Sequence, residues 1–178
     1  MRDYRALGAA ERFDKIASIG MVEHVGREKL PEYFGQAWRL LRSGGMFLNH
    51  GIAHPPGFGT SPAESFSDAY VFPDGDPAPI NVNTRAAEET GFEVRDVESL
   101  REHYAMTLRH WVRRLEHHRG EATRLTDEAT YRTWRLYMSA SAHGFAAGQY
   151  SIYQSLLVRT DGGRSGVPLT REDWYGNG

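Results

Sequence analysis

A carboxylate and two imidazoles lie close to short apolar segments in the first third of the chain. Glu23 and His24 follow one such segment, and His50 stands inside the next one. Two histidines and a carboxylate form the ligand set of a non-haem iron centre. Adjacent positions 23 and 24 fit poorly around one metal ion, so we predict no metal site and keep iron as an alternative. By residue type alone, Glu23 is a surface carboxylate and His50 a hydrogen-bonded core histidine.

The elements predicted around these residues form a strand, helix, strand unit. Residues 13–20 are compactly apolar and close on a glycine, as in a short strand. Apolar positions over 27–42 recur on one helical face, the glycines of 43–45 are predicted to end that helix, and 46–52 form a second strand. A crossover of this length implies parallel pairing. The carboxyl ends of adjacent parallel strands meet at one edge, so Glu23 and His50 are expected to reach one cleft.

The remaining segments continue an α/β pattern. A helix over 81–90 capped by Gly91 precedes a strand over 92–97, and amphipathic helices over 100–119 and 126–145 precede a last strand over 150–158. We therefore expect a single partial α/β domain with strand–helix–strand units over 1–99, a helical insertion over 100–147, the last strand over 148–159 and a tail over 160–178.

Composition excludes several classes of protein. With 21 basic and 23 acidic side chains in 178 residues, the net charge of −2 provides no field to hold nucleic acid. The chain has no cysteine, which removes disulfides, thiolate metal sites and a cysteine nucleophile. No apolar run approaches the roughly 20 residues that span a bilayer, so we expect a cytoplasmic protein with at most peripheral membrane contact.

A nucleotide-binding α/β domain usually opens with a strand that runs into a Gly-rich turn, followed by an acidic residue for the ribose. Neither feature is present in this sequence. The pair Gly44 and Gly45 precedes a predicted strand instead of following one, so we interpret it as a helix stop and not a phosphate loop.

Five segments in order along the chain resemble the cyclopropane-fatty-acyl-phospholipid synthase and mycolic acid cyclopropane synthase family. They are SIGMVEHVG at 18–26, LNHGI at 48–52, YVFPDG at 70–75, HYAMTLRHW at 103–111 and IYQS at 152–155. The resemblance implies the C-terminal half of a class I, Rossmann-like methyltransferase sheet with a two-helix insertion before the last strand. It also implies an S-adenosylmethionine-dependent enzyme that acts on the cis double bond of unsaturated phospholipid acyl chains.

In the family reaction, methyl transfer to the alkene gives a carbocation, and loss of a proton then closes a cyclopropane ring. A bound bicarbonate ion takes the role of base in this family. By motif match, the resemblance implies that Glu23, His50 and Tyr104 hold the ion through their side chains and Ile52 through its backbone. A carboxylate beside an anion favours a shared proton between them.

The resemblance also implies residues for the cofactor and for the acyl chain. Ile19, His24 and Tyr4 match positions around the cofactor, although Tyr4 reads equally well as an ordinary exposed tyrosine. The candidates for the acyl cavity, each of which also reads as plain core, are Phe72, Trp111, Tyr137 and Phe145.

This sequence departs from the family by lacking the upstream half with its cofactor loop, so we expect the chain to be inactive alone. Its first strand is then an uncovered sheet edge, which pairs readily with another chain. One alternative is therefore a noncatalytic assembly module that binds a second copy or an N-terminal partner through that edge. A second is a related methyltransferase that methylates without ring closure.

A basic cluster is the candidate for contact with the inner membrane face. Its members are Arg109, His110, Arg113, Arg114, His117, His118 and Arg119. Such a cluster attracts anionic headgroups, and the alternative is a solvated helix face.

Overall fold

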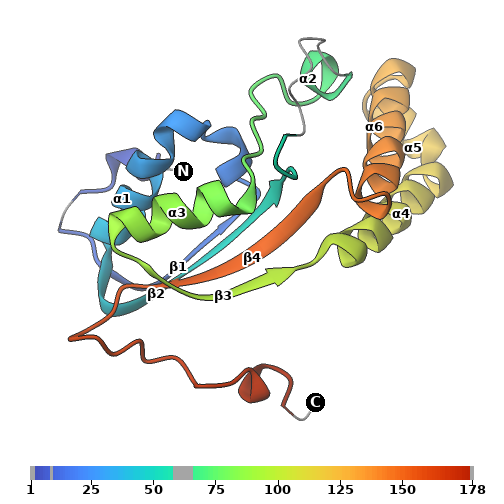
Figure 1. Cartoon of the computed structure of the whole chain (residues 1–178). Helices are drawn as coiled ribbons and strands as arrows, with labels where there is room; N and C mark the ends of the chain where they lie inside the picture. The colour runs from blue at the N-terminus through green and yellow to red at the C-terminus, as the bar shows by residue number, and fades with distance from the viewer. Residues whose placement is uncertain (1–2, 9, 58–65, 177–178) are drawn as a thin grey trace.

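A mixed four-stranded sheet with strand order β1-β2-β4-β3 organises the molecule (Figure 1). The computed structural model describes residues 3–8, 10–57 and 66–176. Strand β1 pairs with β2 in parallel, whereas β4 runs antiparallel to both of its neighbours. The strands are β1 (Phe13–Ile19), β2 (Leu41–Ala53), β3 (Glu93–Ser99) and β4 (Ser151–Val158). The structure confirms the α/β class and the parallel pairing of the first two strands.

Helices α1 (Leu30–Leu40) and α3 (Ile80–Thr90) cover one face of the sheet (Figure 1). The apolar stripe of α1 supplies Tyr33 and Phe34, which pack with Phe47 of β2 and with Phe92 in the main core cluster. Helix α3 ends as predicted at Gly91, whose φ of 112° gives the left-handed cap that glycine adopts most readily.

The helical insertion stands at one end of the sheet as an arm (Figure 1). It contains α4 (Arg101–His117) and α6 (Glu128–Ala146), the two long helices that the sequence predicts, with a short α5 (Arg119–Leu125) between them that was not predicted. A second core cluster joins the arm to the sheet through Leu108, Phe145 and Ile152. The remaining helical elements are α2 (Phe66–Tyr70) and the 3-10 turns η1 (Tyr4–Ala6), η2 (Val22–His24), η3 (Arg27–Lys29) and η4 (Glu172–Trp174).

The prediction that glycines 44 and 45 end the first helix is wrong. Helix α1 ends at Leu40 because Leu41 is already extended, with φ −80° and ψ 143°. Arg159 of the chain after β4 donates to the carbonyls of Trp38 and Leu41, at 2.8 and 2.9 Å, and so satisfies the end of the helix. Gly44, with φ 78°, lies inside β2, where the register with β1 is irregular.

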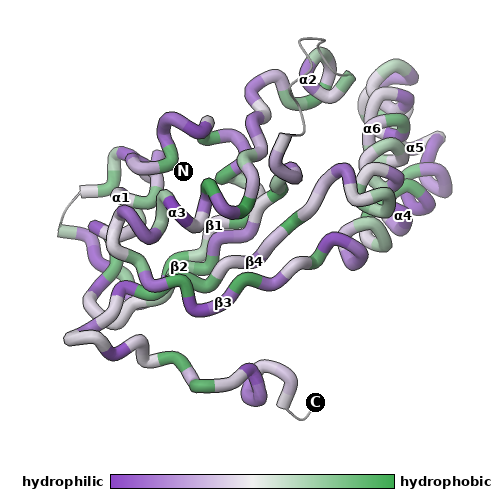
Figure 2. Tube along the Cα trace, in the orientation of Figure 1, coloured by the Kyte–Doolittle hydropathy of each residue, from purple (hydrophilic) through white to green (hydrophobic). Residues whose placement is uncertain are grey.

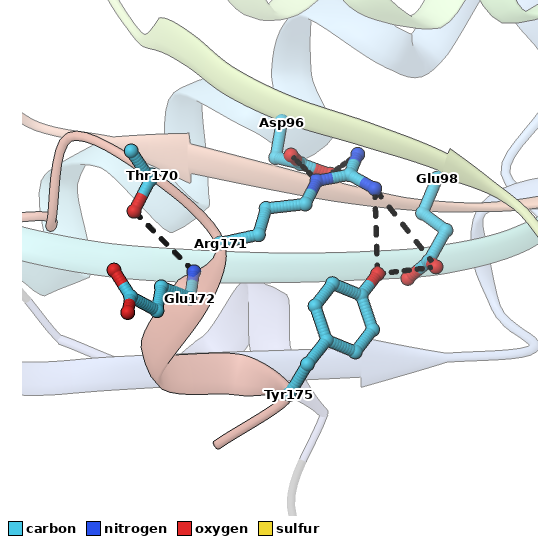
Figure 3. Close-up of polar contacts among 6 residues, drawn as sticks. All are labelled: Asp96, Glu98, Thr170, Arg171, Glu172 and Tyr175. Carbon is cyan, nitrogen blue, oxygen red and sulfur yellow. Dashed lines mark hydrogen bonds and ion pairs between the residues drawn. The ribbon is translucent and has the colours of Figure 1, made fainter.

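The C-terminal tail lies over the opposite face of the sheet, which no α-helix of the described residues covers (Figure 1). A cavity of about 520 Å³ lies between them, lined by apolar side chains that include Met46, Leu48 and Leu156, and by Trp174 of the tail. Arg171 anchors the tail through two bonds to the Asp96 carboxylate, of 2.6 and 2.7 Å (Figure 3). Hydropathy differs between the sheet and the helical arm: hydrophobic residues recur along β2, whereas parts of α4 and α5 are strongly hydrophilic (Figure 2).

No helix in the part of the chain that the structure describes is long and apolar enough to cross a membrane.

Candidate active site

Glu23 is a buried carboxylate at the end of β1. The turn η2 carries it directly after the strand, and 7% of the residue is exposed. Its Oε1 accepts a hydrogen bond from the backbone N–H of Ile52 at 3.4 Å, while Oε2 is buried with no hydrogen-bond partner among the described residues. Burial raises the pKa of Glu23 above its ordinary value. The arrangement favours a carboxyl group that keeps a proton at higher pH than an exposed one and has one oxygen free for a ligand.

Gly51 provides the space for this carboxylate. A Cβ atom on Gly51 would lie 2.9 Å from Oε2 of Glu23 and 2.2 Å from Cγ1 of Val22. A side chain at position 51 is therefore incompatible with the observed position of η2. The sequence motif around His50 thus includes a glycine whose role is steric, which the sequence analysis did not identify.

Two half-buried tyrosines of the helical arm have raised pKa values. Burial is the main cause of the raised pKa values of Tyr104 on α4 and Tyr137 on α6, and the charge of Glu23 raises both further. Tyr104 also packs edge-on against Phe145, with ring centroids 4.9 Å apart. Ile52, which donates to Glu23, packs against the same core cluster as Tyr104, whereas Tyr137 contacts Phe72 and Trp134.

His50, on β2, is held by a different partner. Its Nδ1 is 3.0 Å from Nε2 of Gln154 on β4, and burial lowers its pKa. Strand alternation directs His50 to the face of β2 opposite Gly51. No hydrogen bond among the described residues joins its ring to Glu23 or Tyr104.

The residues expected around a cofactor occupy three different environments. Ile19 ends β1 beside His50 in the register and is 69% exposed. The ring of His24 packs against Phe72, with centroids 5.2 Å apart. Tyr4 is half-buried against Tyr33 at 5.9 Å, so the alternative of an ordinary exposed tyrosine is wrong.

The iron alternative gains no support from these positions. Among the described residues, no group of three or more His, Cys, Asp or Glu side chains has the arrangement of a metal site.

The four acyl candidates divide into two aromatic groups. Phe72 and Tyr137 contact each other at 5.5 Å and share a cluster with Trp134, which lies 6.3 and 5.8 Å from them. Phe145 is only 2% exposed and belongs to the second core cluster. Trp111 is 39% exposed and packs edge-on against Tyr104.

Trp134 was not among the expected acyl residues. It lies one helical turn before Tyr137, so the helical spacing already placed the two side chains on neighbouring positions of one face. This spacing is the signal from which its role in the cluster was predictable.

Solved structures of similar fold define the class of the protein. The mycolic acid cyclopropane synthase CmaA1, solved in complex with SAH and CTAB, is similar with a TM-score of 0.78 and 30% identity, over 86% of this chain and 57% of that one. The cyclopropane synthase MmaA2 from Mycobacterium tuberculosis is similar with a TM-score of 0.75 and 28% identity, over 83% and 55% of the two chains. The fold is thus that of part of a methyltransferase domain.

Sequence comparison gives the family. The model of the family described as mycolic acid cyclopropane synthetase matches residues 1–155, and the chain belongs to that family. A "Probable fatty acid methyltransferase" of Pseudomonas putida is 42% identical over 97% of this chain and 45% of its own length. A "Probable fatty acid methyltransferase" of Mycobacterium tuberculosis is 39% identical over 94% of this chain and 39% of its own length. The chain therefore spans less than half the length of these two relatives.

Proposed function

We propose that this chain is the acyl-binding and proton-handling half of an S-adenosylmethionine-dependent methyltransferase. The reaction is transfer of a methyl(ene) group to the cis double bond of an unsaturated phospholipid acyl chain, with closure of a cyclopropane ring. The observation that carries the proposal is the buried, unpartnered Oε2 of Glu23 in a protein of this family, joined through Ile52 to the core cluster against which Tyr104 packs.

The donor set at Glu23 fits a small oxyanion such as bicarbonate. A protonated Glu23 donates from Oε2, and the Tyr104 hydroxyl is a second donor from α4. The raised pKa of Glu23 supports this protonated form, because a neutral acid beside an anion avoids the repulsion of two like charges. The Ile52 N–H donates to Oε1 of Glu23 and so holds the carboxyl group in place, with Oε2 left for the anion.

The aromatic cluster fits the acyl chain. Phe72, Trp134 and Tyr137 present ring faces and edges to one another, and Phe72 also packs against His24, the residue after Glu23. Such faces tolerate a developing positive charge. Phe72 and Tyr137 are half-buried, which limits the access of water to a carbocation. When bound, S-adenosylmethionine supplies the methyl group and bicarbonate accepts the proton. In the proposal, Ile19 and His24 contact the cofactor at the open end of β1.

A chimera tests this proposal. In the chimera, this chain replaces the downstream half of the Pseudomonas putida relative and follows the upstream half of that relative. Binding of S-adenosylhomocysteine by calorimetry reports assembly of the fold, and mass spectrometry of acyl chains after incubation with deuteromethyl cofactor reports transfer. We expect labelled cyclopropane acyl chains, lost in Glu23→Gln and reduced in Tyr104→Phe with cofactor binding intact. A chimera that binds the cofactor analogue but labels no acyl chain contradicts the proposal.

The same product analysis distinguishes simple methylation from ring closure. A methylated but uncyclised acyl chain carries the label without the ring. If it is the only product, it supports the alternative that this chain belongs to a related methyltransferase that methylates without ring closure.

A second candidate function rests on the sheet edge. Strand β1 is an edge strand with Phe13 39% exposed and Ile19 69% exposed. Such an edge can pair with a second copy or another chain, which is the assembly-module alternative. Light scattering of the isolated chain tests it, because a monomer with amides of β1 well protected from hydrogen exchange contradicts that function.

A further inference from the structure

We infer that Gln154 is a positioning residue that holds His50 as a single tautomer. In this tautomer the ring proton is on Nε2, and the unprotonated Nδ1 accepts a hydrogen bond from the Gln154 amide. The placement follows from the contacts of β2 and β4. The consequence drawn for catalysis, that His50 acts as a donor to a bound anion and not as a base, rests on the proposed function.

The antiparallel register brings the two side chains together. His50 lies directly opposite Gln154, and the flanking pairs Asn49 with Ser155 and Gly51 with Tyr153 keep the register regular on both sides. Directly opposed residues of an antiparallel pair project to the same face of the sheet. The side-chain amide of Gln154 is thereby held 3.0 Å from Nδ1 of His50.

The chemistry of the two nitrogens sets the tautomer. An amide nitrogen carries two hydrogens and donates only, so the ring nitrogen that faces it must accept. A neutral imidazole with an accepting Nδ1 carries its proton on Nε2. Protonation of Nδ1 would place its N–H against the N–H of the Gln154 amide, which disfavours the cationic form of the ring. Burial, which lowers the pKa of His50, disfavours the same form.

The charged groups around this pair are already engaged elsewhere. Across the sheet the register places Ile19, His50, Gln154 and Glu98 in one row. Glu98 accepts a hydrogen bond from the Tyr175 hydroxyl at 3.2 Å and lies 4.0 Å from the Arg171 guanidinium (Figure 3). Asp96 is held by Arg171, and Lys15 lines the same cavity from β1. Gln154 is therefore the neutral group that separates His50 from the acidic side of the cavity.

The consequence for the proposed reaction is a division of roles. With Nδ1 occupied by the Gln154 amide, His50 has one functional hydrogen, on Nε2. Because His50 projects to the face of β2 opposite Gly51, it can donate this hydrogen only to an anion that reaches that face. Proton acceptance then falls to that anion, because the imidazole has no vacant basic nitrogen. The pair thus explains why His50, whose pKa burial lowers, need not act as the base.

Nitrogen-15 NMR of the histidine rings in the 178-residue chain tests the inference without methyl donor or acyl substrate. His50→Asn assigns the His50 signals among the eight histidines. We expect the wild-type ring to show the Nε2–H tautomer across neutral pH. Gln154→Leu should lose that single-tautomer signature, and Gln154→Glu should raise the pKa of His50 by about 1 to 3 pH units through a new opposite charge.

Gln149→Leu is the matched control, because Gln149 is exposed and reaches His54 only through its backbone carbonyl. It should leave the His50 signals unchanged. An Nδ1–H tautomer in the wild type overturns the inference, as does an unchanged His50 spectrum in Gln154→Glu. Because the readout is independent of turnover, an inactive chimera with the expected tautomer would reject the proposed function and leave this inference standing.

Discussion

Glu23 and Ile52 are joined by a hydrogen bond from the backbone N–H of β2 to one carboxylate oxygen, while the other oxygen is buried without a partner among the described residues. One bond does not compensate for removing a carboxylate from water. Burial therefore raises the pKa of Glu23, and the folded state binds its proton more tightly than the unfolded chain does. The stability that this proton gives is fully present below the unfolded pKa and is lost as pH rises through the folded pKa.

Glu23→Gln should accordingly stabilise the chain at pH 8 by about 1 kcal/mol, with little difference from the wild type at pH 4. The amide keeps the bond to Ile52 and carries no charge to desolvate. Urea unfolding at both pH values measures the effect. Glu88→Gln on the exposed side of α3 is the control, and it should give the same small change at both pH values. A Glu23→Gln variant less stable than the wild type at pH 8 contradicts this explanation.

Gly51→Ala should destabilise the chain by about 2 kcal/mol, because the new Cβ meets Val22 at 2.2 Å and η2 must move. Gly35→Ala is the matched control within α1, where a Cβ has open space and alanine favours the helix by about 1 kcal/mol. Thermal unfolding should therefore shift in opposite directions for the two variants. A shift in the same direction for both would show that the fit around Gly51 is not the cause.

Much of this site was predictable because it depends on short-range patterns. The glycine-terminated first strand and the helix after it fix β1 beside β2, and their parallel pairing places the turn with Glu23 next to Ile52. The Gln154 contact was not predictable, because it depends on the register of β4, more than a hundred residues after His50. Likewise, the end of α1 depends on Arg159, a long-range partner that local glycine patterns do not reveal.

The tail illustrates the same limit. Its Gly and Pro content predicts irregular structure, which is what the chain after β4 shows apart from η4. Its position under the sheet depends on Arg171 meeting Asp96, two residues with no special spacing. Charged residues of this kind occur throughout the sequence, and only the fold selects the pair.

Arg171→Gln should loosen the tail without unfolding the sheet. The substitution removes the bidentate pair with Asp96, so the amides of Trp174 in η4 and of Tyr175 directly after it should exchange hydrogen faster. Hydrogen exchange with mass spectrometry measures this, and Asp96→Asn should produce the same change from the other partner. Arg85→Gln, which breaks an exposed pair with Glu89 on α3, should leave the tail as it is. Unchanged exchange in Arg171→Gln would mean that other contacts hold the tail.

Trp134→Ala should weaken binding of a cis-unsaturated lysophospholipid about tenfold, because it removes one ring of the cluster with Phe72 and Tyr137. Acyl chains brominated near the double bond should quench Trp134 fluorescence in the wild type. Trp174→Ala is the control, since Trp174 lies in the tail on the other side of the sheet. Equal weakening by both substitutions would place the acyl chain elsewhere.

The final prediction concerns the basic cluster on α4. Arg109 and Arg113 are exposed one helical turn apart, and neither forms an ion pair with a described residue. Met106, 51% exposed, lies on the same helical face and offers an apolar group to insert between headgroups. We propose that this face contacts anionic membranes, where each positive charge contributes about 1 kcal/mol.

Arg109→Gln with Arg113→Gln should therefore weaken sedimentation with phosphatidylserine vesicles by about tenfold or more at low salt. The matched control, Arg85→Gln with Arg164→Gln, removes the same charge from sites away from the arm. Binding should weaken with added salt in the wild type, because the attraction is screened within about 10 Å at 0.1 M. A solvated helix face with no lipid role predicts equal binding by both double variants. Comparison with the control double variant distinguishes membrane contact through this face of α4 from a general effect of net charge.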